Sequence, residues 1–421
     1  MPDDKTVGAE KQKPAPRIPL DLTNLAKELG NRYISVRWDE VRQRMNTGCL
    51  SMDMEWIHKK EANEHPELIP MLLWEELRPF YTGVTVNNVE MLMEITAKSN
   101  PTIPPLDEVI NPKNPKSPFA GTWKAGDPDY IGGLFPLMHI DPDDTLSQTL
   151  IRKWFYQGIV LLQNTRQEPY GADGVLVLQG DAGVGKTSFF RYAAMRPEWF
   201  VEGGRISEYD KDFLRRLLNG WISELGELER SVNESTMNTF KALVTNRFDA
   251  YRLPYGRQDI ETPRRTNLCA TCNSIEFITD NATSRRCWII PIKQRMLIEA
   301  LAKYPWELVW KQAYAIVQQN RECFRLTPQE QQQLLRRNRG YTVQLPAEQE
   351  CMDILDHLSD SDREAFYTTA TDFKAAYPAE LSKYTAKQVS AALQAYGLVA
   401  INKRVDGKKG RWLMFSADSN N

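Results

Sequence analysis

A glycine-rich stretch near the middle of the chain carries the residues best suited to chemistry. It matches the pattern GxxxxGK[ST] and comprises Gly180, Asp181, Ala182, Gly183, Val184, Gly185, Lys186, Thr187 and Ser188. Glycines let the backbone approach phosphate oxygens and turn amide N–H groups toward them. Lys186 would place a positive charge on the β and γ phosphates, and Thr187 would complete the coordination of Mg²⁺. The stretch predicts a site for ATP with Mg²⁺.

The segments around this loop have the context that the motif requires. Residues 174–179, GVLVLQ, form a short apolar run rich in β-branched residues, and a helix-compatible segment follows the loop. A strand, a loop and a helix in this order distinguish a phosphate-binding loop from a chance match. From Thr145 onward, apolar residues at helical spacing predict a helix that leads into this strand.

Hydrolysis also needs an acidic group at the end of a neighbouring strand. Glu224 and Glu227 lie at the C-terminal end of the strand candidate 220–225 and are candidates for metal ligand and base. The metal ligands that we expect are Glu224 and Thr187. The alternative is that Glu227 belongs to a solvated helix start. Asn273 follows the strand candidate 266–271, where its amide would orient the attacking water; the alternative is an ordinary turn residue.

A pair of arginines precedes another apolar run near Ile290. Arg285 and Arg286 follow a polar turn, TDNATS, which would hold them at the surface. A guanidinium supplied to the γ-phosphate of a neighbouring subunit neutralises charge in the transition state, and this use requires a ring of subunits. A salt-bridged surface pair is the alternative. Together the strand candidates predict a parallel α/β sheet.

Length and composition indicate a multidomain globular chain. The 421 residues favour two or three domains, with 42% hydrophobic and 26% charged residues. The boundaries that we expect are a disordered tail over 1–20, a mainly helical region with a Pro/Gly-rich linker over 21–144, an ATPase core over 145–325, a linker helix over 326–349 and a winged helix over 350–418. The net charge of -2 means that any DNA contact must come from local basic clusters.

Five segments in a fixed order resemble the virulence-associated E family, which is related to superfamily-three helicases of phages and mobile elements. They are GDAGVGKTS, WISELGELE, FKALVTNRFDAYRLPYGRQDIETPRR, CATCN and FITDNATSRRCWIIPI, and the similarity covers residues 67–320. The resemblance implies a AAA+-like P-loop core that assembles as a homo-hexamer around DNA. It also implies an acidic strand like Glu224 to Glu227, a sensor like Asn273 and arginines like Arg285 and Arg286.

Basic and aromatic residues interleave between residues 239 and 265, a composition suited to single-stranded DNA. The candidates for contact are Lys241, Arg252, Tyr255 and Arg257. The resemblance implies a hairpin here that grips DNA in a central channel, with residues 253–256 at its tip.

The C-terminal region predicts helices at 351–358, 371–376 and 386–396, and then a hairpin over 399–415 around Asp406-Gly407. Three helices with such a wing form a winged helix. Lys403, Arg404, Lys408 and Lys409 on the wing suggest contacts with the phosphates of duplex DNA. The alternative is a solvated hairpin in a small packing module.

These features together predict an ATP-dependent DNA helicase for phage or mobile-element replication. An initiator or loader ATPase that binds DNA without processive unwinding is the main alternative, and a small-molecule kinase is a third. No apolar run is long enough for a membrane span, and the start of the chain is not a signal peptide. We therefore expect the protein in the cytoplasm of a bacterial host, without membrane partners.

Overall fold

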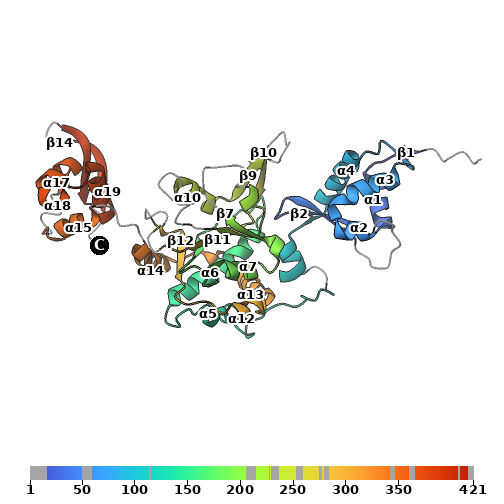
Figure 1. Cartoon of the computed structure of the whole chain (residues 1–421), viewed down its shortest axis with the longest axis horizontal. Helices are drawn as coiled ribbons and strands as arrows, with labels where there is room; N and C mark the ends of the chain where they lie inside the picture. Colours follow the sequence, from blue (N-terminus) through green and yellow to red (C-terminus); the bar gives the residue numbers. More distant parts are fainter. Residues whose placement is uncertain are drawn as a thin grey trace, which may run out of the picture. The chain divides into compact units, whose positions relative to one another are not determined.

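The computed structural model forms two compact units, Met1–Ser274 with Asn281–Arg336, and Ile275–Asp280 with Arg337–Asn421. The structure describes these residues: 17–49, 59–112, 115–204, 215–226, 228, 237–252, 259–274, 277–278, 284–341, 347–359, 366–405 and 408–415 (Figure 1). Among them, no helix combines the length and apolar character needed to cross a membrane.

A five-stranded parallel sheet forms the centre of the first unit (Figure 1). Its order is β12-β6-β11-β8-β7. The strands are β6 (Val175–Gln179), β7 (Phe200–Gly204), β8 (Ile222–Leu225), β11 (Asn267–Cys272) and β12 (Cys287–Pro291). The parallel α/β sheet expected from the sequence is confirmed, and its three inner strands, β6, β11 and β8, are the ones that matter for the site.

Four helices pack around this sheet: α6 (Thr145–Leu162), α7 (Lys186–Ala193), α12 (Ile298–Ala302) and α13 (Trp306–Gln319). All but α12 carry aromatic residues of the core. The side chains of Trp154, Trp221 and Trp310 are fully buried. The ring centroids of Trp221 and Trp310 lie 4.3 Å apart, and those of Trp154 and Trp310 lie 6.0 Å apart. Each large side chain buried in this way contributes roughly 1.5–3 kcal/mol, so the aromatic cluster holds the helices firmly on the sheet.

The N-terminal region contains helices, as the sequence predicts, and also a small sheet that the sequence analysis did not predict. Helices α1 (Leu22–Asn31), α2 (Lys59–Glu64), α3 (Ile69–Leu77) and α4 (Val86–Lys98) accompany a sheet of order β3-β2-β5. Its strands are β2 (Ile34–Asp39), β3 (Arg44–Cys49) and β5 (Pro101–Thr102). Ile34, Val36 and Trp38 are buried and alternate with more exposed residues, which is the period of a strand. A short parallel pair, β1 (Ile18–Pro19) with β4 (Tyr81–Thr82), lies partly within the expected tail.

The Pro/Gly-rich segment 101–144 is not a linker, because much of it belongs to the core of the first unit. After strand β5, it contains a π-helix, η2 (Pro105–Ile110), and helix α5 (Leu134–Leu137). Val109, Ile131 and Leu134 are buried in the same cluster as the aromatic residues of α6 and α13. Asp129 accepts hydrogen bonds from Arg152 in α6 and Gln312 in α13. Prolines and glycines prevent long helices here, yet they do not prevent burial.

The second unit combines helices with a three-stranded sheet of order β13-β15-β14. The helices are α15 (Glu348–Asp356), α17 (Ala370–Ala376), α18 (Pro378–Leu381) and α19 (Ala386–Tyr396), and the strands are β13 (Tyr367–Thr368), β14 (Leu398–Val405) and β15 (Lys408–Phe415). The expected hairpin is confirmed, since β14 and β15 pair antiparallel over their whole length. Its turn, Asp406-Gly407, lies outside the described residues. Helix α14 (Pro328–Asn338) precedes this unit, as the sequence predicted.

Candidate functional site

Three glycines with positive φ shape the loop between β6 and α7. Gly180, Gly183 and Gly185 have φ of 152°, 81° and 100°. A Cβ atom on Gly180 would lie 2.3 Å from the Ile292 carbonyl oxygen, and one on Gly185 would lie 2.2 Å from Ile298 Cδ1. Any side chain at these two positions would therefore be both strained and obstructed. The loop closes directly onto helix α7, whose N-terminal amides favour an anion.

The segment after β12 supports this loop from one side. The amide of Ile292 donates to the Gln179 carbonyl oxygen at 2.7 Å, and the amide of Met296 donates to the Val184 carbonyl oxygen at 3.0 Å. These contacts hold the loop in place through the backbone. Sequence reasoning missed this segment because backbone hydrogen bonds leave no signal in residue types.

The Lys186 ammonium group lies inside the loop and is only 7% exposed. Its Nζ donates to the carbonyl oxygens of Gly180 at 2.6 Å and Asp181 at 2.7 Å, and to Asn273 Oδ1 at 2.8 Å. Three donors of an ammonium group are thus occupied. Lys186 and Asn273, predicted separately from the sequence, are in direct contact.

The Glu224 carboxylate is the buried acid of the site, with 2% of the residue exposed. Its Oε1 accepts hydrogen bonds from the hydroxyls of Thr187 and Thr271, each at 2.8 Å. Burial raises the pKa of Glu224, because desolvation disfavours the charged form, and the two hydroxyls oppose this rise. Thr271 was not among the residues predicted from the sequence, although its place near the end of a buried strand was a usable signal.

The strand register explains why these residues meet. In the parallel ladders, Cys272 of β11 is level with Gln179 of β6, and Ala270 of β11 is level with Leu225 of β8. Parallel strands present their carboxyl ends at one edge of the sheet. Since β11 lies between the loop strand and the acidic strand, Asn273 is placed between Lys186 and Glu224. The structure brings Lys186 to Asn273 and Thr187 to Glu224 at this edge of the sheet, and their roles stay predictions. Glu227 lies outside the described residues.

The arginine pair lies at the amino ends of the strands, opposite the carboxyl ends that carry the loop. Arg285 and Arg286 immediately precede β12, and the Arg286 carbonyl oxygen accepts from the amide of Val175, the first residue of β6. The five residues of β6 separate this edge from the loop by about 15 Å. Arg285 is exposed and Arg286 is half-buried. The fold therefore keeps both arginines away from the loop of their own chain.

The segment of basic and aromatic residues contains helix α10 (Met237–Thr245) and an antiparallel hairpin of β9 (Phe248–Arg252) and β10 (Asp259–Pro263). The hairpin is confirmed, and its tip with Tyr255 and Arg257 lies outside the described residues. Lys241 is half-buried on α10. Arg264 is not available to DNA, since it is 1% exposed and its Nε donates to Asp249 at 2.7 Å. Arg265 is likewise committed, donating to the Leu162 carbonyl oxygen at 2.6 Å.

The cations predicted on the C-terminal hairpin occupy its two strands near the turn. Lys403 is level with Gly410, and Arg404 is level with Lys409. The structure does not describe the side chains of Lys403, Arg404, Lys408 and Lys409, so their contact with DNA stays a prediction.

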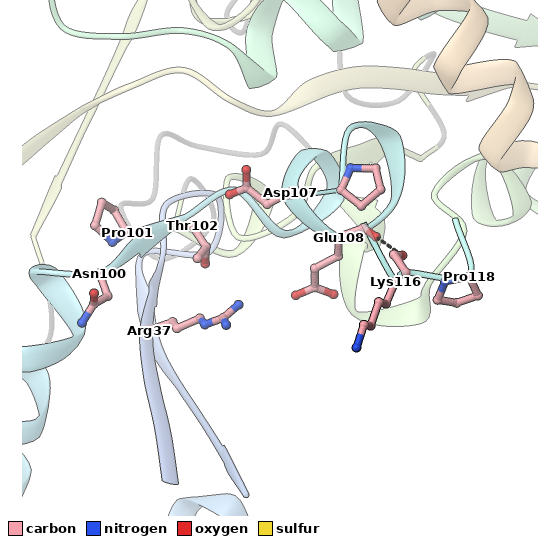
Figure 2. Close-up of a pocket in the computed structure, with 10 residues that line it drawn as sticks. Arg37, Asn100, Pro101, Thr102, Asp107, Glu108, Lys116 and Pro118 are labelled. Carbon is pink, nitrogen blue, oxygen red and sulfur yellow. Dashed lines mark hydrogen bonds between the residues drawn. The ribbon is translucent and has the colours of Figure 1, made fainter. Parts of the chain in front are cut away.

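A separate pocket of about 580 Å³ lies elsewhere in the first unit. It is lined by residues of β2, β5, η2 and the following loop, among them Arg37, Thr102, Asp107 and Glu108 (Figure 2). Both carboxylates are engaged, Asp107 with the Ile103 amide and Glu108 with Arg196. The pocket residues include none from the loop between β6 and α7, so the pocket is distinct from the site described above.

A family model matches the part of the chain that carries these residues. Residues 129–343 match the virulence-associated protein E-like domain. This match spans just over half of the chain, from Asp129 through the whole parallel sheet. The chain belongs to the virulence-associated protein E-like family.

Solved structures of one other protein region are similar to this chain at low sequence identity. One similar structure is "The apo structure of NrS-1 C terminal region (305-718)", with 12% identity and a TM-score of 0.49, covering 94% of this chain and 99% of that chain. Another, the A form of the same region, has 13% identity and a TM-score of 0.47, covering 94% and 100%. No curated protein matches the chain significantly.

We expect the buried charge of Glu224 to reduce the stability of the unliganded protein at neutral pH. Because its pKa is raised on folding, the folded protein holds the proton more tightly, and stability falls as pH rises from the ordinary value of 4.5 through the raised pKa. Glu224→Gln removes this penalty and keeps an oxygen for the threonine hydroxyls.

In EDTA, the melting temperature of Glu224→Gln should equal or exceed that of the wild type at neutral pH, and the difference should shrink as pH falls toward 4.5. Glu299→Gln on α12 controls for the loss of one negative charge. A Glu224→Gln protein that melts well below the wild type at neutral pH would contradict the expectation.

Proposed function

We propose that the protein is an ATP-dependent DNA helicase of phage or mobile-element replication, built on a AAA+-like P-loop core. The observation that carries the proposal is the meeting of Lys186, Thr187, Glu224 and Asn273 at the carboxyl edge of the sheet. A phosphate-binding loop, a buried acid and an amide between them are the groups that nucleotide hydrolysis requires. Membership of the virulence-associated protein E-like family supports a replication role by the relationship already described.

The residues present fit Mg²⁺ as a cofactor. Magnesium prefers oxygen ligands and commonly takes one or two from protein side chains beside substrate phosphates. The Thr187 hydroxyl at the start of α7 and the Glu224 carboxylate near the end of β8 are adjacent oxygen donors. When bound, the ion would neutralise charge on the β and γ phosphates.

Each residue of the chain then has a distinct task. The loop amides and Lys186 bind the phosphates, and Lys186 exchanges contacts with the loop carbonyls for contacts with the nucleotide. Asn273 orients the attacking water, and Glu224 accepts its proton. Burial of Glu224 suits this task, because it raises the pKa of the carboxyl and makes it a stronger base.

Assembly into a ring, which the family resemblance implies to be hexameric, is supported by the position of the arginines. Arg285 and Arg286 lie at the sheet edge opposite the loop, about 15 Å from it along β6. They cannot neutralise the γ-phosphate in their own chain, whereas exposure of Arg285 makes it available to a neighbour. We propose that each nucleotide site is completed by an arginine of the adjacent subunit.

Two elements are proposed to contact DNA. The β9–β10 hairpin, with Lys241 on the preceding helix, would track single-stranded DNA in the channel. The C-terminal unit, read as a winged helix, would contact duplex phosphates through the cations on β14 and β15. An initiator or loader ATPase would use the same elements without strand displacement, so an unwinding assay separates the two functions.

The first test is steady-state ATP hydrolysis with and without single-stranded DNA, alongside light scattering for the oligomeric mass. We expect turnover that requires Mg²⁺ and increases with DNA, from a ring. Lys186→Ala should lose turnover by at least about a hundredfold while its circular dichroism is unchanged. A monomer whose turnover ignores DNA would contradict the helicase.

Mixing two inactive variants tests the shared site. A ring of Arg286→Ala subunits should bind nucleotide with little turnover, because every loop faces a neighbour without the guanidinium. A ring of Lys186→Ala subunits should also be inactive, because every loop lacks its lysine. In mixed rings, a Lys186→Ala subunit supplies Arg286 to the intact loop of an adjacent Arg286→Ala subunit, so turnover should recover substantially. Absence of recovery in verified mixed rings, or wild-type turnover by Arg286→Ala, would contradict the interface role. Arg285→Ala in the same format identifies which arginine acts.

The hairpin cations can be tested by charge reversal. Lys408→Glu with Lys409→Glu should weaken duplex DNA binding and reduce the slope of log K against log salt by about 0.9 for each lost phosphate contact. Lys374→Glu on α17 is the matched control in the same unit. An unchanged salt dependence would show that the hairpin does not contact phosphates.

A further inference from the structure

The end of strand β11 orients both charged side chains of the nucleotide site. Thr271 and Asn273 are two residues apart, the spacing that places side chains on one face of an extended segment. The Thr271 hydroxyl donates to Glu224 Oε1, and Asn273 Oδ1 accepts from Lys186 Nζ, each at 2.8 Å. One short segment thus contacts the acid and the lysine together.

The two threonines that hold Glu224 come from different elements. Thr187 belongs to α7 directly after the loop, whereas Thr271 belongs to β11 in the middle of the sheet. Both donate to Oε1, and no hydrogen bond to Oε2 occurs among the described residues. Paired donors on one oxygen restrict rotation of the carboxylate and leave its second oxygen for the reaction.

The two hydroxyls differ in what else they must do. Thr187 is the proposed metal ligand, so its contacts depend on what occupies the loop. Thr271 is 9% exposed and lies within the sheet, with Glu224 as the hydrogen-bonding partner of its hydroxyl. A hydroxyl that has no second task keeps the carboxylate oriented through binding, hydrolysis and release.

We propose that Thr271 is a positioning residue for ATP hydrolysis: its hydroxyl fixes Glu224 Oε1 and so presents Oε2 to the attacking water. The inference rests on the proposed function. It predicts an effect on turnover rather than on nucleotide affinity, because Thr271 contacts the acid and not the loop. Residues that orient a reacting side chain in this way typically contribute 10- to 100-fold, roughly the range that we expect.

The test compares Thr271→Val, Thr271→Ser and Thr266→Val in the full-length protein. Valine keeps the shape of threonine and removes the hydroxyl, whereas serine keeps the hydroxyl. Thr266 is the matched control, since it is also buried and donates to the Gly220 carbonyl oxygen at 2.7 Å, next to the opposite end of β11. For each variant, kcat, the KM for ATP, the Kd for a fluorescent ATP analogue and the melting temperature are measured.

We expect Thr271→Val to lower kcat by about tenfold or more with KM and Kd within about twofold of the wild type. Thr271→Ser should restore most of kcat, and Thr266→Val should keep kcat even if its melting temperature falls as much. The inference is overturned if Thr271→Val keeps kcat, if serine rescues nothing, or if Thr266→Val loses as much turnover. If the wild type does not hydrolyse ATP, the proposed function itself is overturned. If the wild type is active and Thr271→Val is equally active, only the role of Thr271 is overturned.

Discussion

The buried carboxylate of Glu224 is the constraint on which the nucleotide site depends. A carboxylate with 2% exposure is stable only when hydrogen bonds replace the water it has lost. Thr187 and Thr271 supply these bonds from two different elements. Helix α7, strand β8 and strand β11 must therefore keep one relative position, and the aromatic packing of α6 and α13 against the sheet holds them there.

The loop itself is held by close approach of the backbone. Gly180 and Gly185 lie against Ile292 and Ile298, so the segment after β12 packs directly against the loop. The same sheet separates the loop from the arginines, which lie at the amino end of β12. This separation gives the protein two chemically different edges, one with the glycine-rich loop and one with the arginine pair. The proposed ring of identical subunits would bring such edges together.

Several elements could be predicted from residue patterns because local physics determines them. The apolar run before the loop, the glycine spacing and the acid at the end of a strand each led to the correct element, as did the C-terminal hairpin. The N-terminal strands were missed, because alternating residues from Ile34 to Trp38 lie within a longer stretch that also fits helical spacing. The segment around Leu134 was taken for a linker because proline and glycine density signals irregular backbone, and irregular backbone can still be buried.

By itself, the sequence determined which reactive groups the chain carries: a glycine-rich loop with its lysine and threonine, an acid, an amide and an arginine pair. These predictions follow from residue type and short-range spacing, which decide donor groups and backbone freedom. Only the tertiary structure decided which of them meet. The order β12-β6-β11-β8-β7 places Asn273 between Lys186 and Glu224, brings Thr271 to the acid and sends the arginines to the opposite edge. The physical reason is that strand order and register depend on packing between segments far apart in the chain, which local residue patterns do not encode.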